Sequence, residues 1–127
     1  RVLSQLKIAI RTNYSNPPIH GGAVVAAVLN NPERRALWEK ELAEMRVRIK
    51  AMRQKLVDGL KAAGVERDMS FITQQIGMFS YSGLTKDQMV QLRNEFGVYG
   101  TDTGRMCVAA LNSKNIDYVC QSIAKVL

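Results

Sequence analysis

The chain has 127 residues, of which 46% are hydrophobic and 23% charged, a balance typical of one globular domain with its own core. It has no apolar run long enough to span a bilayer, no visible signal peptide, and no Cys-x-x-Cys pair or histidine cluster of the kind that structural zinc requires. The formal net charge of +7 permits binding of nucleic acids or anionic metabolites without requiring it.

The first part of the chain predicts two helices. Residues 1–13 carry apolar side chains on one helical face, and this helix ends before Asn16-Pro17-Pro18 because residues that precede proline are pushed out of the α region. Residues 20–22 predict a loop. The apolar run 23–29 fits a helix or a strand, and we favour a buried helix. Since no cap precedes the first helix and no methionine starts it, we expect the chain to be part of a longer protein.

One long helix is predicted over Pro32–Ala63. Asn31 is a favoured N-cap, proline is favoured in the first turn, and Gly64 stands where a helix usually stops. Its length of roughly 48 Å, at 1.5 Å per residue, exceeds the radius of gyration of about 14 Å expected for a compact domain of this size. Its apolar residues recur at intervals of mostly three and four and form a single stripe, which fits core packing better than a coiled-coil seam because strands follow it. These residues are Trp38, Leu42, Met45, Ile49, Met52, Leu56, Leu60 and Ala63.

The later turns of the long helix are strongly basic. Such a face can bind phosphates, but aromatic residues that would support single-strand binding are absent there. The simpler interpretation is the solvated side of an amphipathic helix. The basic residues are Arg46, Arg48, Lys50, Arg53, Lys55 and Lys61, against the single acid Asp58.

After Gly64 the pattern predicts a small sheet packed with helices, an α/β or α+β arrangement. Short apolar runs bounded by glycine predict strands at 71–73, 78–82 and 106–111. Between the second and third strands, Thr85-Lys-Asp-Gln88 forms a capping box for a helix that glycine ends at position 97.

A last helix is predicted to begin at Asn112 or Ser113. Its buried face should consist of Ile116, Val119, Cys120, Ile123 and Val126. We expect both cysteines, Cys107 and Cys120, to be reduced and buried, as is usual in a cytosolic protein.

Few residues carry a recognisable chemistry. The chain has no nucleophile elbow, phosphate loop or metal-ligand spacing, so we predict no catalytic residue and no metal ligand. Arg105 follows Thr103-Gly104 and precedes an apolar strand, where its fork of donors could hold a carboxylate or phosphate bidentately. The alternative is an ordinary strand-end arginine paired with a nearby acid. Arg11 lies on a helix, where arginines are usually solvated, and His20 is expected to bond the backbone.

Four segments nevertheless resemble the class I aspartate and aromatic-amino-acid aminotransferases. They are Ile10–Pro18, Gly77–Leu84, Glu95–Tyr99 and Gly104–Ala109, and they follow the family's order and spacing over essentially the whole chain. The resemblance implies the C-terminal small domain of a fold-type I transferase dependent on pyridoxal phosphate, an α/β domain entered through one long interdomain helix. It places residues 1–44 at the tail end of the large domain, which holds the cofactor and the dimer interface, and residues 45–127 in the small domain.

The resemblance also implies an activity and roles for five residues. The whole enzyme would be a cytoplasmic homodimer that moves an amino group between aromatic or acidic amino acids and 2-oxoglutarate. Arg105 would hold the substrate α-carboxylate, and Arg11 would reach across the dimer interface to a distal carboxylate. Phe79 would line the pocket, and Ser15 and Asn16 would lie at the subunit boundary.

Other features of the family are not matched in this chain. The Schiff-base lysine, the acid that pairs with the pyridine nitrogen and the phosphate-binding residues are expected upstream of Arg1, so the chain alone should be inactive. Asp102 is unusual beside the carboxylate-binding arginine, and would either compete with substrate for Arg105 or face solvent. The choice between aspartate and aromatic substrates stays open. The alternative function is a non-enzymatic module, either basic and nucleic-acid-binding or serving dimerisation.

Overall fold

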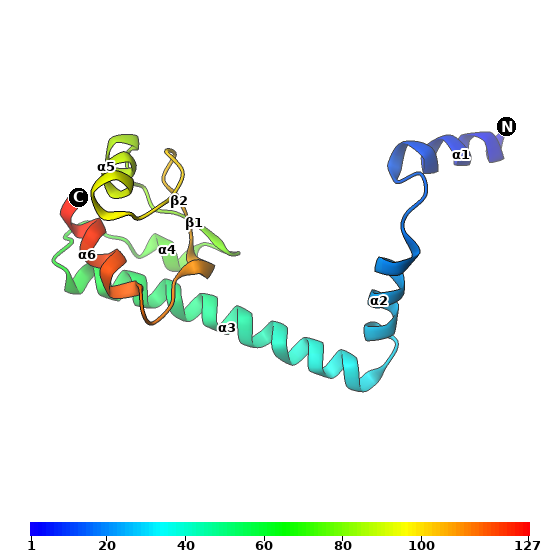
Figure 1. Ribbon diagram of the computed structural model, residues 1–127, viewed down its shortest axis with the longest axis horizontal. Coiled ribbons are helices and arrows are strands. Elements are labelled where there is room, and N and C mark those ends of the chain that lie inside the picture. Colours follow the sequence, from blue (N-terminus) through cyan, green and yellow to red (C-terminus); the bar gives the residue numbers. More distant parts are fainter. The chain divides into compact units, whose positions relative to one another are not determined.

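The computed structural model describes all 127 residues, which divide into two compact units, residues 1–42 and 43–127. The fold is mostly helical and contains one two-stranded sheet. None of its helices combines the length and apolar character that crossing a bilayer requires. In chain order the elements are α1 (Val2–Asn13), α2 (Ile19–Leu29), α3 (Pro32–Ala62), α4 (Phe71–Gln74), β1 (Phe79–Tyr81), α5 (Lys86–Phe96), β2 (Arg105–Cys107), the 3₁₀ helix η1 (Val108–Ala110) and α6 (Ile116–Val126) (Figure 1).

The first unit contains α1 and α2, and both predicted helices are confirmed. The predicted loop at 20–22 is wrong, because α2 already begins at Ile19, directly after the extended Pro18. The Ala and Val run that follows sustains the helix through Gly21 and Gly22, although glycine costs a helix about 1 kcal/mol relative to alanine. No residue of α1 or α2 is buried, so the burial expected for residues 23–29 is not observed.

The long helix is confirmed as α3, which begins in the first unit and ends in the second. The side-chain oxygen of Asn31 accepts a hydrogen bond from the backbone N–H of Arg34 at 3.0 Å. At the other end Gly64 has φ +87°, a left-handed conformation that stops the helix. The apolar stripe is buried only in the second unit, at Met52, Leu56 and Leu60, whereas Trp38, Leu42 and Met45 are exposed.

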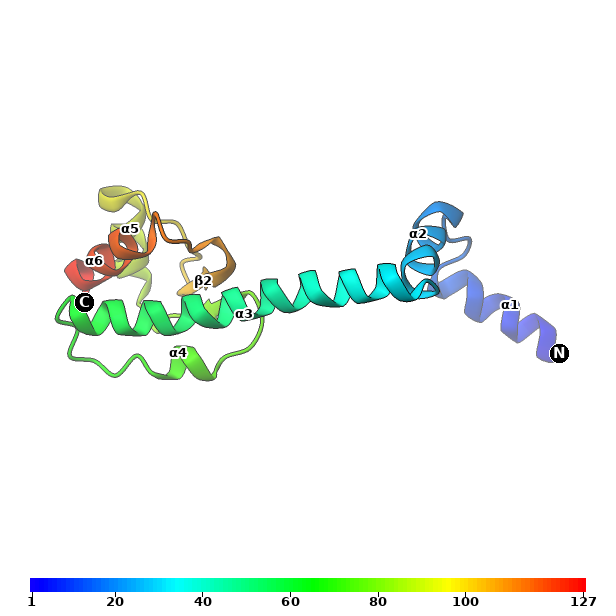
Figure 2. The same ribbon diagram turned by 90° about the horizontal axis from the view of Figure 1, so that it is seen from below.

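The core of the second unit collects buried residues from α3, α4, α5, β2, η1 and α6. Figure 2 shows α6 and α4 on different sides of the C-terminal half of α3. The thiol of Cys120 donates to the carbonyl of Leu56 at 3.7 Å, and a Cβ at Gly59 would lie 2.6 Å from the same sulfur atom. All five residues predicted for the buried face of α6 are buried.

The capping box of α5 is confirmed. Thr85 and Gln88 exchange side-chain to backbone hydrogen bonds, and Gly97 ends the helix with φ +63°. The amide of Gln88 also donates to the carbonyl of Val126 at 2.8 Å. One side chain therefore both starts α5 and ties it to the end of α6.

The sheet pairs β1 with β2 in antiparallel register, with Phe79 opposite Cys107 and Tyr81 opposite Arg105. The strand predicted at 71–73 is wrong, since these residues form the single helical turn α4. A hydrogen bond from the backbone N–H of Ser70 to Asp68, 2.8 Å long, precedes this turn and lowers the pKa of Asp68. Such local side-chain bonds compete with strand pairing.

The strand predicted at 106–111 is too long. Strand pairing ends at Cys107, and η1 follows. The reason is that the guanidinium of Arg48 donates hydrogen bonds to the carbonyl oxygens of Ala109 and Leu111, at 2.8 and 2.9 Å. These bonds replace those of a strand partner. Both cysteines are free, as predicted. Cys120 is buried, but Cys107 is only half-buried.

The start of α6 and the basic face of α3 also differ from prediction. The N-cap residue of α6 is Asn115, rather than Asn112 or Ser113, and its side-chain oxygen accepts the backbone N–H of Asn112 at 2.8 Å. The basic face is not solvated throughout, since Arg48 bonds two carbonyls and Arg53 is only 3% exposed.

Stability should decrease between pH 9 and pH 11 because of Cys120. Burial, with a smaller contribution from the charge of Asp117, raises the pKa of this thiol from 9.0 to about 11. The unfolded chain loses the proton as the pH rises past 9 while the folded chain keeps it, so this contribution is complete below pH 9 and is lost by pH 11. We expect a loss of roughly 2 kcal/mol in the free energy of unfolding, measured with urea. The variant Cys120→Ala should lack this part of the decrease, and an equal decrease in both proteins would contradict the assignment.

Candidate functional site

The site is built on the turn that leads into β2. Gly104 has φ +84°, and a Cβ there would lie 2.9 Å from the carbonyl oxygen of Leu84, so the turn accepts only glycine without rearrangement. The carbonyl of Gly104 accepts two bonds from Ser82, one from its backbone N–H at 2.9 Å and one from its hydroxyl at 2.8 Å. The turn is thereby fixed to the segment that follows β1.

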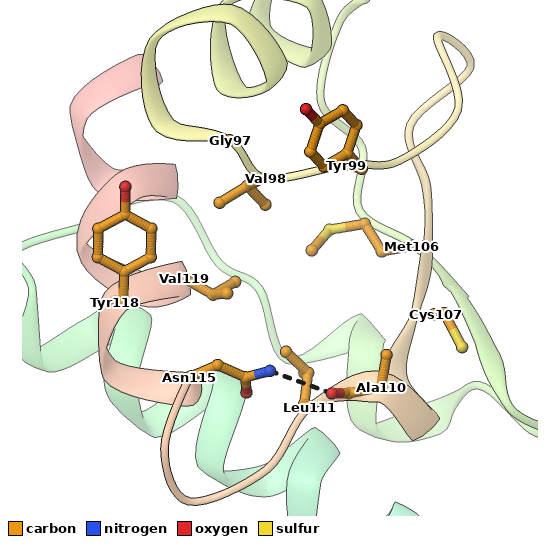
Figure 3. A pocket seen from close by; sticks show the side chains of 10 residues that line it. All are labelled: Gly97, Val98, Tyr99, Met106, Cys107, Ala110, Leu111, Asn115, Tyr118 and Val119. Carbon is orange, nitrogen blue, oxygen red and sulfur yellow. Dashed lines mark hydrogen bonds between the residues drawn. The ribbon is translucent and has the colours of Figure 1, made fainter.

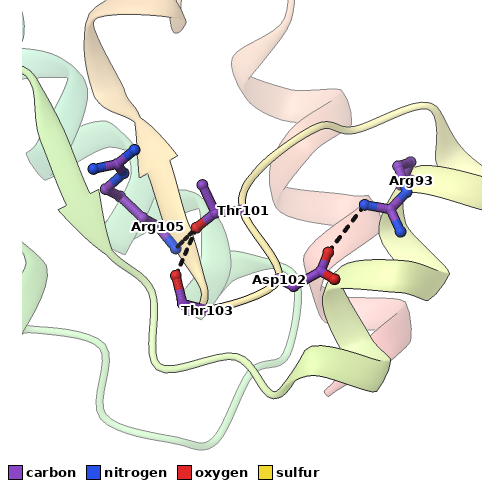
Figure 4. A network of polar contacts seen from close by, with 5 residues as sticks. All are labelled: Arg93, Thr101, Asp102, Thr103 and Arg105. Atoms are coloured by element: carbon purple, nitrogen blue, oxygen red, sulfur yellow. Dashed lines mark hydrogen bonds and ion pairs between the residues drawn. The ribbon is translucent and has the colours of Figure 1, made fainter.

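The backbone of Arg105 is held by the same turn. Its N–H donates to the Thr101 hydroxyl at 3.1 Å, and its carbonyl accepts the N–H of Thr101 at 3.0 Å. The hydroxyls of Thr101 and Thr103 lie 2.8 Å apart and form a further hydrogen bond (Figure 4). Both polar groups of the Arg105 backbone are therefore satisfied locally, and its side chain starts from a fixed position.

The guanidinium of Arg105 is free of partners within the chain. It forms neither of the two ion pairs and lies over the ring of Phe79, with its central carbon 5.0 Å from the ring centroid. Phe79 is 46% exposed and Arg105 is also exposed. A cation over an aromatic face is attracted by the ring quadrupole, which holds the fork in place while its N–H donors remain available.

Asp102 does not compete for Arg105. Its carboxylate pairs with the guanidinium of Arg93 at 3.1 Å, and both side chains are partly exposed. In Figure 4 the side chains of Asp102 and Arg105 point away from each other. The alternative in which Arg105 is an ordinary strand-end arginine paired with a local acid is therefore wrong.

The remaining predicted site residues belong to the first unit. Arg11 lies in the last turn of α1, and one of its terminal nitrogens donates a hydrogen bond to the hydroxyl of Ser15 at 3.4 Å. Ser15 has φ +56°, the left-handed conformation. Arg11, Ser15 and Asn16 are all exposed. The structure thus brings Arg11 to Ser15 in one unit and Arg105 to Phe79 in the other.

A cavity of about 260 Å³ lies elsewhere in the second unit. Its lining contains no charged side chain and none of the five predicted site residues, so it does not suit a carboxylate. The lining residues are Gly97, Val98, Tyr99, Met106, Cys107, Ala110, Leu111, Asn115, Tyr118 and Val119 (Figure 3).

Sequence reasoning missed one residue that supports β1. Arg53 donates to the carbonyl of Phe79 at 2.8 Å and to the hydroxyl of Ser80 at 2.8 Å. A signal was present, because position 53 lies four residues after Ile49 and three before Leu56 and therefore stands in the apolar stripe. A charged residue at such a position is expected to be buried with partners.

Taken together, the second unit is a small helical domain whose two-stranded sheet carries an exposed arginine, Arg105, that has no side-chain partner except the ring of Phe79. The family model "Aminotransferase class I and II" matches residues 1–123. The chain therefore belongs to this family, as the resemblance predicted.

Individual proteins agree with the family match. The chain is 60% identical to an aspartate aminotransferase of Pseudomonas aeruginosa and 51% identical to an aromatic-amino-acid aminotransferase of Escherichia coli, in each case over 100% of the chain and 32% of the relative. A crystal structure of the aromatic-amino-acid aminotransferase of Burkholderia pseudomallei, covalently bound to pyridoxal phosphate, has 68% identity and a TM-score of 0.92, over 100% of the chain and 32% of that protein. The chain thus spans about a third of the length of these proteins, and the predicted fold is confirmed.

The close approach at Gly104 predicts a measurable difference between two glycines. Gly64→Ala introduces strain at φ +87° in open space, whereas Gly104→Ala introduces similar strain at φ +84° and also a contact with a carbonyl oxygen. We expect about 1–2 kcal/mol of destabilisation for the first and at least about 1 kcal/mol more for the second, from urea unfolding of the chain. Equal losses would show that the turn adapts to a side chain.

Proposed function

We propose that this chain is the substrate-carboxylate-binding part of an aminotransferase that moves an amino group between aromatic or acidic amino acids and 2-oxoglutarate. Residues 45–127 form its small C-terminal domain and residues 1–44 the tail end of its large domain, with α3 passing from one to the other. The observation that carries the proposal is the unpaired guanidinium of Arg105, which is held over Phe79 and fixed by its backbone.

Arg105 binds the α-carboxylate that every amino-acid substrate carries. A guanidinium offers two parallel N–H donors to a carboxylate, and such bidentate contacts set orientation as well as affinity. Orientation matters for this reaction, because the Cα–H bond must be held in the direction in which it is weakened. Phe79 keeps the fork in register and lines the pocket beside it.

Arg11 binds the distal carboxylate of aspartate, glutamate or 2-oxoglutarate. In the proposed homodimer it reaches the site of the partner subunit, and Ser15 and Asn16 lie at the boundary between the subunits. Support comes from the exposure of all three residues and from the contact that holds Arg11 near Ser15. Two arginines at a fixed separation recognise a dicarboxylate at both ends, whereas an aromatic substrate engages only the first.

Pyridoxal phosphate is the proposed cofactor of the whole enzyme, where it supplies the electron sink for the chemistry at Cα. The resemblance places the lysine of its covalent attachment upstream of Arg1, and no lysine lies in the four segments of this chain that carry the resemblance. The attachment site is therefore proposed to lie outside the chain, and the chain by itself is expected to be inactive. Transamination by the purified 127-residue chain would contradict this.

We also propose a substrate range and a cellular location for the whole enzyme. Curated relatives include both aspartate and aromatic-amino-acid aminotransferases, which supports a broad enzyme acting on both classes. The two free cysteines fit the reducing cytoplasm.

The non-enzymatic alternative finds no support. Two arginines of the basic face of α3, Arg48 and Arg53, donate hydrogen bonds to backbone carbonyls within the chain. They are not available for nucleic-acid phosphates, and the remaining cations on α3 are spread over its exposed side.

The role of Arg105 has a direct kinetic test in the full-length enzyme. Arg105→Leu should lower kcat/KM about a hundredfold or more for aspartate and phenylalanine alike, because both lose the partner of their α-carboxylate. Arg46→Leu is the matched control, since Arg46 is an exposed arginine of the second unit outside both ion pairs, and its removal should leave kcat/KM unchanged. An unchanged kcat/KM in Arg105→Leu would overturn the assignment.

The role of Arg11 is separated by comparing substrates. Arg11→Leu should lower kcat/KM for aspartate about a hundredfold and change the value for phenylalanine far less, because phenylalanine has no distal carboxylate. Steady-state kinetics with both amino acids in one preparation makes the comparison internal. Equal losses for the two substrates would exclude the distal-carboxylate role.

A further inference from the structure

A buried arginine lies behind β1 and takes no direct part in the proposed site. Arg53 of α3 is 3% exposed, and burial lowers its pKa. No carboxylate of the chain pairs with it, since the two ion pairs are Arg35 with Glu39 and Arg93 with Asp102. A guanidinium stays protonated in proteins, so this is a buried cation whose partners are all neutral.

Those partners lie on one continuous segment. One terminal nitrogen of Arg53 donates to the carbonyl of Ile72 at 3.0 Å and to the hydroxyl of Ser80 at 2.8 Å. The other donates to the carbonyls of Gly77 and Phe79 at 2.7 and 2.8 Å. The planar fork therefore joins α3 to α4, to the approach to β1 and to β1 itself.

Gln75 completes the same edge of β1. Its side-chain oxygen accepts bonds from the Ser80 hydroxyl at 2.6 Å and the Tyr81 N–H at 2.8 Å, and its amide donates to the Tyr81 carbonyl at 3.0 Å. In an antiparallel pair, alternate residues direct both backbone polar groups to the same side. The edge of β1 that faces away from β2 is thus bonded to side chains of Arg53 and Gln75 instead of a third strand.

We propose that Arg53 is a positioning residue for the carboxylate site: by fixing the Phe79 backbone from behind, it places the ring that supports the Arg105 fork. This inference rests on the proposed function. The Phe79 carbonyl is 2.8 Å from Arg53, and the Phe79 ring centroid is 5.0 Å from the guanidinium carbon of Arg105. Two arginines therefore act on one phenylalanine, Arg53 through its backbone and Arg105 through its ring.

Charge alone does not account for this arrangement. A lysine at position 53 would keep the positive charge, but its ammonium group is a single point with three donors and does not span four acceptors in the plane of a guanidinium. Arg53→Lys therefore separates positioning from electrostatic attraction. If Arg53 only added positive potential to the site, this variant would bind carboxylates as well as the parent does.

The test uses the full-length enzyme and 3-phenylpropionate, a carboxylate that lacks the reacting amino group and has nothing for Arg11 to hold. Its inhibition constant should rise about tenfold in Arg53→Lys, and KM for aspartate and phenylalanine should rise together. The control is Ile123→Ala in the core face of α6, a residue that is 1% exposed and belongs to neither strand. If Ile123→Ala lowers the urea midpoint of unfolding as much as Arg53→Lys does, it should still leave the inhibition constant of 3-phenylpropionate unchanged.

A double-mutant cycle adds a readout that general destabilisation would not move. Phe79→Leu should weaken binding of 3-phenylpropionate in the parent, but should add little in the Arg53→Lys background, because the ring is already misplaced. Full additivity of the two changes would overturn the inference.

The remaining outcomes separate this inference from the proposed function. An unchanged inhibition constant in Arg53→Lys, with a large change in Arg105→Leu, overturns the positioning role and leaves the function in place. No change in Arg105→Leu overturns the function itself. If Arg53→Lys does not yield folded enzyme, the double-mutant cycle is repeated with Arg53→Gln and Phe79→Leu: non-additive losses in 3-phenylpropionate binding support the inference and additive losses overturn it.

Discussion

The second unit depends on how two arginines of α3 satisfy backbone carbonyls that no strand reaches. A two-stranded sheet of three residues per strand leaves most of its backbone without a ladder partner, and a strand pair of this size is marginal in water. Arg53 bonds the approach to β1 and the strand itself, while Arg48 bonds η1 directly after β2. The helix thereby replaces the neighbouring strands that a larger sheet would provide. A buried guanidinium without an anion carries a desolvation cost, which its hydrogen bonds to neutral oxygens offset only because all of them are made at once.

Local signals predicted the parts of the fold that local interactions determine. The caps of α3 and α5, the stop signals at Gly64 and Gly97, and the buried face of α6 follow from side chains within a few residues of one another. The wrong predictions have a different origin. Residues 106–111 read as one apolar strand, but pairing ends at Cys107 because Arg48, about sixty positions earlier in the chain, takes the carbonyls that follow. The run at 71–73 read as a strand because its apolar residues are too few to distinguish one helical turn from an extended segment.

The candidate site divides in the same way. Arg105 could be singled out from its position after Gly104, and the chemistry of a guanidinium fork predicted a carboxylate or phosphate as its ligand. Neither its contact with Phe79 nor the pairing of Asp102 with Arg93 could be predicted, because β1 and β2 are joined by more than twenty residues whose path is set by packing. Arg53 was predictable in principle. Its place in the apolar stripe conflicts with its charge, and such a conflict between local pattern and burial usually marks a residue with a specific task.

The formal charge of +7 also acquires a different meaning once the arginines are placed. Counted over the sequence, the basic residues of α3 allowed a surface for phosphates, although the solvated side of an amphipathic helix was the simpler interpretation. In the structure, Arg48 and Arg53 donate hydrogen bonds to backbone carbonyls, and Arg93 forms an ion pair with Asp102. Among these arginines, only Arg105 combines a fixed backbone with a guanidinium that has no hydrogen-bond partner. The proposed ligand, an amino-acid carboxylate, is accordingly a small anion that engages one guanidinium of this unit at a time. A polyanion needs many cations free along one face, whereas Arg48 and Arg53 of α3 already bond backbone carbonyls around the sheet that carries Arg105.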